Sequence, residues 1–157
     1  AICTRYIPDK EIAEDILQDS FIKIFSSIGS FKSKGEGAFK AWISRITVNE
    51  ALMYLRKQKR CNFIEFQDHL PDIPEDAEPD IGNIPAAEIQ KMIQSLSDGY
   101  RTIFNLVALE GKSHKEVAEL LGITESTSAS QFHRARKILA KKITDYNKRN
   151  DAGTARK

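Results

Sequence analysis

The chain has 157 residues, of which 41% are hydrophobic, so it can bury one ordinary core or two small ones. No apolar run approaches the roughly 18 residues that a membrane helix needs, and the first six residues do not resemble a secretory signal. We therefore expect a cytoplasmic globular protein. Cys3 and Cys61 form no C-x-x-C pair, so a disulfide framework, a zinc site and any other metal or cofactor site are not expected.

The net charge of +2 hides an uneven distribution along the chain. Residues 1–60 hold 11 basic and 7 acidic side chains, residues 61–87 hold 0 and 7, and residues 88–157 hold 13 and 8. Two basic blocks separated by an acidic segment indicate two surfaces for a polyanion, joined by a segment that does not bind it.

The first basic block predicts two helices. Asp9 can cap a helix whose apolar residues recur at three- and four-residue spacing and are expected to share one buried face: Ile12, Ile16, Leu17, Phe21, Ile24, Phe25 and Ile28. After a break at residues 29–37, a second helix is expected over about 38–59. On that helix Arg45, Asn49 and Arg56 fall on one line beside Trp42, and Lys59 and Arg60 extend the line. Cations, an amide and an aromatic ring suit unpaired DNA, although a core role for Trp42 and a structural role for Asn49 stay open.

The acidic segment 61–87 predicts a linker. It contains four of the five prolines, which prevent helix continuation, and its like charges repel one another. We expect it to be extended.

The second basic block predicts short helices around 89–96 and 100–107, the latter ended by Gly111, and then a helix-turn-helix. Ser113 and Glu116 form a capping-box pattern for a short helix that Gly122 ends, and Thr124 can cap a final helix through about Ile143. No strand pattern is found, and residues 148–157 are expected to form a flexible tail. The expected fold is all-α: two small helical domains, residues 1–60 and 88–147, joined by an acidic proline-rich linker.

The last helix predicts a DNA-reading face. With Phe132, Ala135 and Leu139 turned to the core, the opposite side carries hydroxyl and basic groups. Such side chains reach base edges and phosphates in a major groove. We expect duplex contacts from Ser126, Thr127, Ser130, His133, Arg134 and Lys137. A solvated surface is the alternative for His114 and His133, and Lys141 and Lys142 can equally be charges favoured near a helix end.

Several motifs together resemble a known family. The run from Ala13 to Phe21 (AEDILQDSF) and the run from Phe39 to Asn49 (FKAWISRITVN) resemble domain two of the extracytoplasmic-function sigma factors, within the sigma-70 family. The motifs Leu96-Ser97, YRTIF at 100–104, EVAELLGI at 116–123 and Arg134-Ala135-Arg136 resemble domain four. Together they span nearly the whole chain apart from the linker and the tail.

The resemblance implies a function and roles for residues. It implies a promoter-specific initiation factor that binds core RNA polymerase through its clamp coiled coil and flap, melts the downstream promoter element and grips the upstream one. Matching positions place Asp15, Gln18 and Asp19 on the polymerase, with a solvated helix face as the alternative. Lys32, Ser33 and Lys34 fall in the family's specificity loop, which captures a flipped base, and Asn49 matches a nearby strand contact. An anti-sigma factor is an expected partner.

Two departures from the family pattern accompany the resemblance. The family's opening helix of domain two would lie before most of this sequence, so domain two is expected to be shortened at its N-terminus and to lack packing for the Ile12–Ile28 stripe. Ala129 stands where many relatives carry a cation, which weakens the expected upstream contact.

Two other functions are weighed. A stand-alone helix-turn-helix regulator would need a dimer surface, and no apolar surface beyond the predicted cores is apparent. A metal-dependent hydrolase would need clustered ligands, and His69, His114 and His133 form no such pair, so an enzyme is not expected.

Overall fold

The computed structural model describes residues 1–58, 79–82 and 84–154, with side chains described as far as Asn150. Every regular element in these ranges is helical, which confirms the all-α prediction there. The chain divides into two compact units, unit 1 (Ala1–Cys61) and unit 2 (Asn62–Lys157). Most of the expected linker, together with Lys59 and Arg60, lies outside the described residues. None of the helices in the described ranges combines the length and apolarity that a membrane crossing needs.

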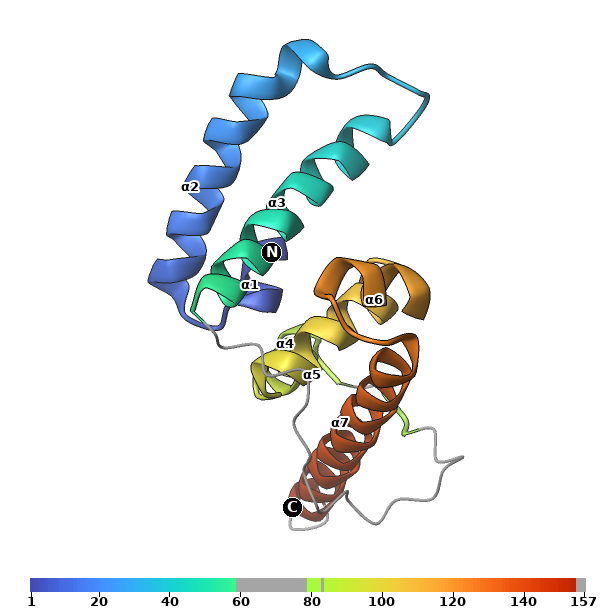
Figure 1. The fold of residues 1–157 in the computed structure, drawn as a ribbon. Helices are drawn as coiled ribbons and strands as arrows, with labels where there is room; N and C mark the ends of the chain where they lie inside the picture. The colour runs from blue at the N-terminus through green and yellow to red at the C-terminus, as the bar shows by residue number, and fades with distance from the viewer. Residues whose placement is uncertain (59–78, 83, 155–157) are drawn as a thin grey trace. The chain divides into compact units, whose positions relative to one another are not determined.

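Within residues 1–58, unit 1 consists of three α-helices and one short turn. They are α1 (Ile2–Tyr6), α2 (Lys10–Ser27), the 3₁₀ turn η1 (Ile28–Ser30) and α3 (Ala38–Lys57). The long helices α2 and α3 lie side by side and run in opposite directions, joined by the loop after η1 (Figure 1). Asp9 caps α2 as predicted, because its Oδ1 accepts a hydrogen bond from the Ile12 amide at 3.1 Å.

The core of unit 1 lies where the short α1 contacts both long helices. All three helices contribute side chains that are at most 6% exposed: Cys3, Tyr6, Ala13, Ile16, Ile24, Val48, Ala51, Leu52 and Leu55. Burial raises the pKa of the Cys3 thiol, so this cysteine is a small apolar core residue.

The predicted apolar face of α2 is partly wrong. The buried positions are Ala13, Ile16, Ser20 and Ile24, whereas Phe21 is 50% exposed and Phe25 is 73% exposed. Leu17 and Ile28 are exposed as well. Residues spaced by three and four positions cover two adjacent helix faces, and only one of those faces packs against α1 and α3.

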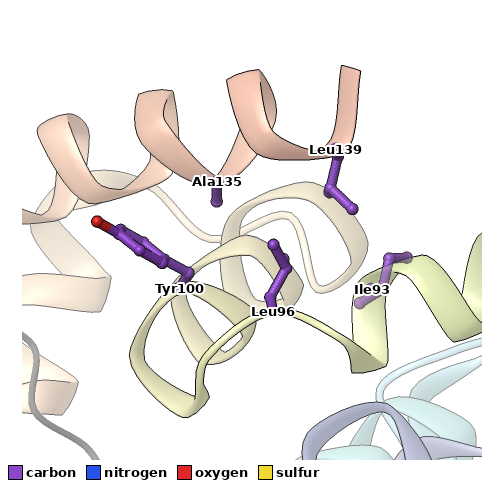
Figure 2. Packing of buried hydrophobic residues seen from close by; sticks show 5 residues of the cluster. All are labelled: Ile93, Leu96, Tyr100, Ala135 and Leu139. Carbon is purple, nitrogen blue, oxygen red and sulfur yellow. The ribbon is translucent and has the colours of Figure 1, made fainter. Parts of the chain in front are cut away.

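Unit 2 contains the remaining helices. These are α4 (Ala86–Gln94), α5 (Asp98–Phe104), the π-helical turn η2 (Asn105–Leu109), α6 (His114–Leu121) and α7 (Glu125–Thr154). Its core is centred on a cluster in which α4 and α5 pack against one side of α7 (Figure 2). The cluster residues are Ile93, Leu96, Tyr100, Ala135 and Leu139.

The first and last helices of unit 2 extend beyond the ranges that the sequence predicts. Helix α4 begins at Ala86, inside the expected linker, and Ile84 before it is buried. The carbonyl oxygen of Asp80 accepts a hydrogen bond of 2.8 Å from Asn147 of α7, so this end of the expected linker contacts unit 2. Helix α7 continues to Thr154, beyond the expected start of the tail at Lys148. Neither packing against a distant helix nor the length of α7 follows from local composition.

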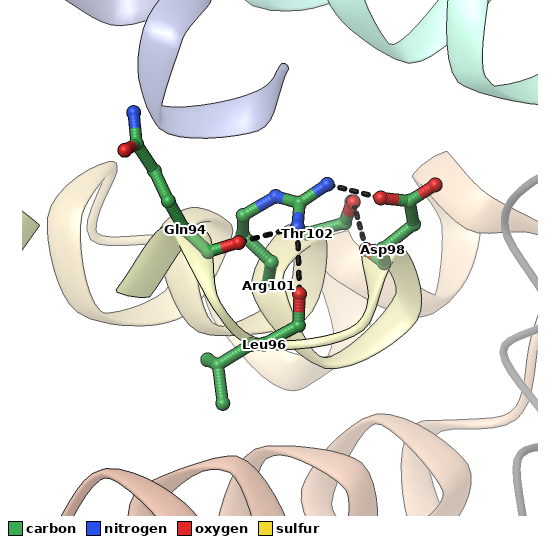
Figure 3. Close-up of polar contacts among 5 residues, drawn as sticks. All are labelled: Gln94, Leu96, Asp98, Arg101 and Thr102. Carbon is green, nitrogen blue, oxygen red and sulfur yellow. Dashed lines mark hydrogen bonds and ion pairs between the residues drawn. The ribbon is translucent and has the colours of Figure 1, made fainter. Parts of the chain in front are cut away.

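Arg101 is a buried cation in the first turns of α5, close to the residues that join α5 to α4 (Figure 3). Its side chain is 2% exposed and pairs with Asp98, and its Nη1 donates to the carbonyl oxygens of Leu96 at 2.6 Å and Gln94 at 3.1 Å. These carbonyls belong to the end of α4 and the residues after it, where backbone acceptors lack helical partners. Arg101 thus caps one helix from the next.

Candidate nucleic-acid interface

The helix-turn-helix of unit 2 is built as the sequence predicts. Ser113 and Glu116 form a capping box: the Glu116 amide donates to Ser113 Oγ at 3.2 Å, and Glu116 Oε2 accepts from the Ser113 amide at 2.8 Å. Hydrogen bonds from Ser113 hold the pKa of the Glu116 carboxyl below its ordinary value. Gly122 ends α6 with a positive φ of 68°, and Thr124 Oγ1 accepts from the Thr127 amide at 3.0 Å to start α7.

The predicted reading face of α7 has unequal exposure. Ser126, Ser130 and His133 are exposed, whereas Thr127, Arg134 and Lys137 are half-buried. Thr127 also takes part in the cap, because its hydroxyl lies 2.8 Å from that of Thr124. On the opposite side Ala135, Leu139 and Ile143 are buried, as the helical spacing predicts.

His114 plays a part that sequence reasoning missed. Its ring packs edge-on against Phe132 of α7, and its Nδ1 lies 3.0 Å from the hydroxyl of the fully buried Ser128. Phe132 stacks in turn on Phe104. His114 therefore links the first helix of the helix-turn-helix to the second. The residues are 14 positions apart, so no local pattern indicates the contact.

In unit 1 the loop before α3 lies next to an aromatic cluster. The rings of Phe31, Phe39 and Trp42 pack on one another with centroid distances of 5.1–6.0 Å. In the sequence, the stretch between Phe31 and Phe39 contains Lys32, Ser33 and Lys34, and all three are exposed. Gly35 and Gly37 have positive φ angles of 116° and 78°, which residues with a Cβ rarely adopt. Trp42 is half-buried and belongs to this cluster, while Phe39 is 46% exposed.

A cleft of about 400 Å³ lies between α2 and α3, and Asn49 stands at its wall. The exposed Asn49 shares the cleft with five residues that sequence reasoning did not select, namely Lys23, Ser26, Ser27, Ile46 and Glu50. The Lys23 ammonium contacts Glu50 Oε1 at 2.6 Å. Because Lys23 and Glu50 are 27 positions apart and lie on different helices, the cleft forms only when α2 and α3 pack together.

The remaining predicted residues of unit 1 are all exposed. Arg45 and Arg56 lie along α3, and Asp15, Gln18 and Asp19 lie along α2. Among the described residues, no group of His, Cys, Asp and Glu side chains is arranged to hold a metal ion.

Comparison with known families assigns both units. Residues 1–61 match the family model for sigma-70 region 2, and residues 86–139 match the model for sigma-70 region 4. The chain is 32% identical over 159 aligned positions to the ECF RNA polymerase sigma-E factor of Haemophilus influenzae, with 90% of this chain and 79% of that protein covered. It is 30% identical to the ECF RNA polymerase sigma factor SigW of Bacillus subtilis, with 92% and 82% covered.

The chain belongs to the extracytoplasmic-function (ECF) sigma factors of the sigma-70 family. As an ECF sigma factor it is a DNA-binding initiation factor that works with RNA polymerase at promoters, and it is not an enzyme. This membership also decides against the stand-alone regulator.

A solved structure supports the fold of this ECF sigma factor. The sigma factor RpoE of Bartonella quintana, crystallised in complex with the anti-sigma factor NepR, aligns with a TM-score of 0.55 at 24% identity. The alignment covers 89% of this chain and 86% of the solved one, so the likeness extends to both helical units.

Proposed function

We propose that the two units of this sigma factor bind promoter DNA in two different states. Unit 2 binds the upstream element as a duplex, and unit 1 binds one unpaired strand of the downstream element. The observation that carries the proposal is the chemical difference between the two surfaces. In unit 2, hydroxyl and basic groups line one face of α7, whereas the surface of unit 1 presents aromatic rings and a cleft with an asparagine amide at its wall. We further propose residues 1–60 and 88–147 as the two functional domains, acting in the cytoplasm.

The upstream contact is assigned to the first half of α7. Small exposed hydroxyls near the start of a recognition helix allow close approach to base edges, and cations further along reach phosphate or guanine. Ser126 and Ser130 fit the first role, and Arg134 and Lys137 fit the second. His133 lies at the edge of this face. Thr127 acts mainly through the cap that it shares with Thr124.

The downstream contact is assigned to the loop, the aromatic cluster and the cleft. A flipped base fits a cleft of about 400 Å³, which lies within the ~300–1,000 Å³ range of small-molecule sites. Asn49 offers both a donor and an acceptor to an unpaired base edge, and Ile46 offers an apolar contact for the base plane. The strand's phosphates are proposed to contact the basic side chains Lys32, Lys34, Arg45 and Arg56. Ser33 adds a hydrogen-bond partner in the loop, and Trp42 supports the loop from the aromatic cluster.

Polymerase docking is assigned to the polar edge of α2. Asp15, Gln18 and Asp19 are exposed beside the apolar side chains that unit 1 leaves uncovered. An anti-sigma factor is a proposed second partner, in line with the RpoE–NepR complex. The acidic segment 61–87 is proposed to stay off DNA through its negative charge.

The test compares closed and pre-opened promoters. Asn49→Ala is expected to slow strand opening, visible as reduced permanganate reactivity of unpaired thymines, and to recover on a template mismatched across the melted region. The recovery follows because a pre-opened template already supplies the unstacking free energy. Arg134→Ala is the matched control: it is expected to weaken duplex binding by about 1–3 kcal/mol, an effect that disappears on a promoter without the upstream element. Equal defects of Asn49→Ala on both templates would contradict the proposal.

A further inference from the structure

The cleft beside Asn49 contains a carboxylate in a protein that binds a polyanion. The Glu50 side chain is only 11% exposed, and its Oε1 contacts the ammonium of Lys23, which is 50% exposed. The pair has no net charge, so the carboxylate does not repel the phosphates of an approaching strand as an isolated acid would. A carboxylate has two oxygens and accepts several hydrogen bonds, so Oε2 can accept from a donor in the cleft while Oε1 holds Lys23.

The two serines of the cleft add acceptors and no donors. The Ser26 hydroxyl donates its hydrogen to the carbonyl oxygen of Ile22 at 2.8 Å, and the Ser27 hydroxyl donates to that of Lys23. A hydroxyl has a single hydrogen, so each serine presents only lone pairs to the cleft. Together with Glu50, they supply several acceptors to the cleft, next to the donors of Asn49 and Lys23. A base that places an amino donor beside a ring-nitrogen acceptor matches this set of groups.

We propose that Glu50 is a specificity-determining residue that selects an adenine or a cytosine for this cleft and disfavours thymine. This inference rests on the proposed function of the cleft as the site of a flipped base. Adenine and cytosine place an exocyclic amino group beside an unprotonated ring nitrogen. Glu50 Oε2 accepts from the amino group, and the Asn49 amide donates to the ring nitrogen. Thymine has a carbonyl oxygen in place of the amino group, so it would face the carboxylate with a second acceptor.

The experiment uses the full chain with core polymerase and a promoter library randomised across the downstream element, followed by sequencing of the transcripts. The position read by the cleft is the one whose base preference is lost in Asn49→Ala. At that position the wild-type protein is expected to prefer adenine or cytosine over thymine by on the order of tenfold or more, the discrimination of one good base contact. Glu50→Gln is expected to reduce that preference to about threefold or less, because an amide can also donate to the thymine carbonyl.

Two controls separate base reading from a purely structural ion pair. Lys23→Met removes the same ion pair but is expected to keep the preference against thymine, since Glu50 still accepts from the amino group. Glu11→Gln neutralises an exposed acid in the first turn of α2, away from the cleft, and is expected to change nothing. Equal loss of preference in Lys23→Met and Glu50→Gln would overturn the assignment of Glu50.

A base analogue tests the amino group directly. At the selected position, adenine is replaced by purine, which lacks only the amino group. The replacement is expected to reduce initiation by the wild-type protein and to leave initiation by Glu50→Ala unchanged. Wild-type protein that uses purine as well as adenine would refute the role of Glu50. If Asn49→Ala changes the preference at no position, the proposed function of the cleft fails instead, so the two failures are distinguishable.

Discussion

The Nδ1 atom of His114 lies 3.0 Å from the buried hydroxyl of Ser128, and this contact joins the two helices of the helix-turn-helix. His114→Ala removes the partner of a fully buried polar group, so it is expected to reduce the stability of unit 2 by about 1–3 kcal/mol. Urea unfolding followed by circular dichroism measures the loss, and Lys115→Ala, at an exposed position of the same helix, is the control. The change should also weaken duplex binding, because α7 loses its fixed angle to α6. An unchanged urea midpoint would show that the contact is dispensable.

Removing Arg101 should destabilise unit 2 more strongly. Arg101→Met leaves Asp98 and two backbone carbonyls without their donor, with an expected cost of about 3 kcal/mol or more. Arg101→Lys should recover little of it, since a single ammonium lacks the fork that reaches carboxylate and carbonyls together. Arg136→Ala, at an exposed position, should stay within about 0.5 kcal/mol of wild type. Similar urea midpoints for the Arg101 and Arg136 variants would contradict this role.

The capping box predicts a pH dependence. Glu116 has a lowered pKa because Ser113 donates to its carboxylate, so the carboxylate stabilises the folded state above its ordinary pKa of 4.5. That contribution is lost as the pH falls through the lower folded-state pKa. Glu116→Gln has no charge to lose. The difference in the free energy of unfolding between wild type and this variant should therefore become smaller as the pH falls from 7 to below about 4. Urea unfolding over this range measures the difference, and parallel pH profiles would argue against the carboxylate's role.

The two faces of α2 should differ sharply in their response to truncation. Ile24→Ala opens a cavity in the core of unit 1 and is expected to cost about 2–5 kcal/mol. Phe25→Ala removes a larger side chain that is 73% exposed, and it should cost less than about 0.5 kcal/mol. Fluorescence of Trp42, the single tryptophan, follows the unfolding of unit 1 in both variants. A Phe25→Ala cost as large as that of Ile24→Ala would mean that the ring is buried in solution.

Charge reversal on the polar edge of α2 tests polymerase docking. Asp15→Lys/Asp19→Lys is expected to abolish retention by core polymerase in a pull-down, while duplex binding by unit 2 persists. Both side chains are exposed, so the fold should tolerate the change. Lys10→Glu, a charge reversal at an exposed position in the same helix, should leave retention intact. Retention of the double variant would contradict the assignment.

Local signals predicted much of the fold. The caps at Asp9, Ser113 and Thr124 and the left-handed Gly122 follow from side-chain chemistry within a few residues, and each is present as expected. The buried face of α2 could not be chosen from spacing alone, because two adjacent faces carry apolar residues and only packing against α1 and α3 selects one.

The site was predicted less completely than the fold. The exposure of Ser130, opposite the buried Ala135 and Leu139, follows from helical geometry. Helical geometry does not predict the Lys23–Glu50 pair or the His114–Ser128 contact, because each joins segments that only tertiary packing brings together. It does not predict the burial of Arg101 either, because a charged side chain is usually exposed.

The separate cores of the two units also bear on how promoter preference can evolve. Substitutions that share no contacting residues combine nearly additively, so a change within the core of one unit needs no compensating change within the core of the other. With the proposed assignments, recognition of the upstream element can change through substitutions in α7 while the cleft of unit 1 keeps its base preference, and the reverse holds as well. A lineage of such factors can therefore diverge toward new promoters one element at a time.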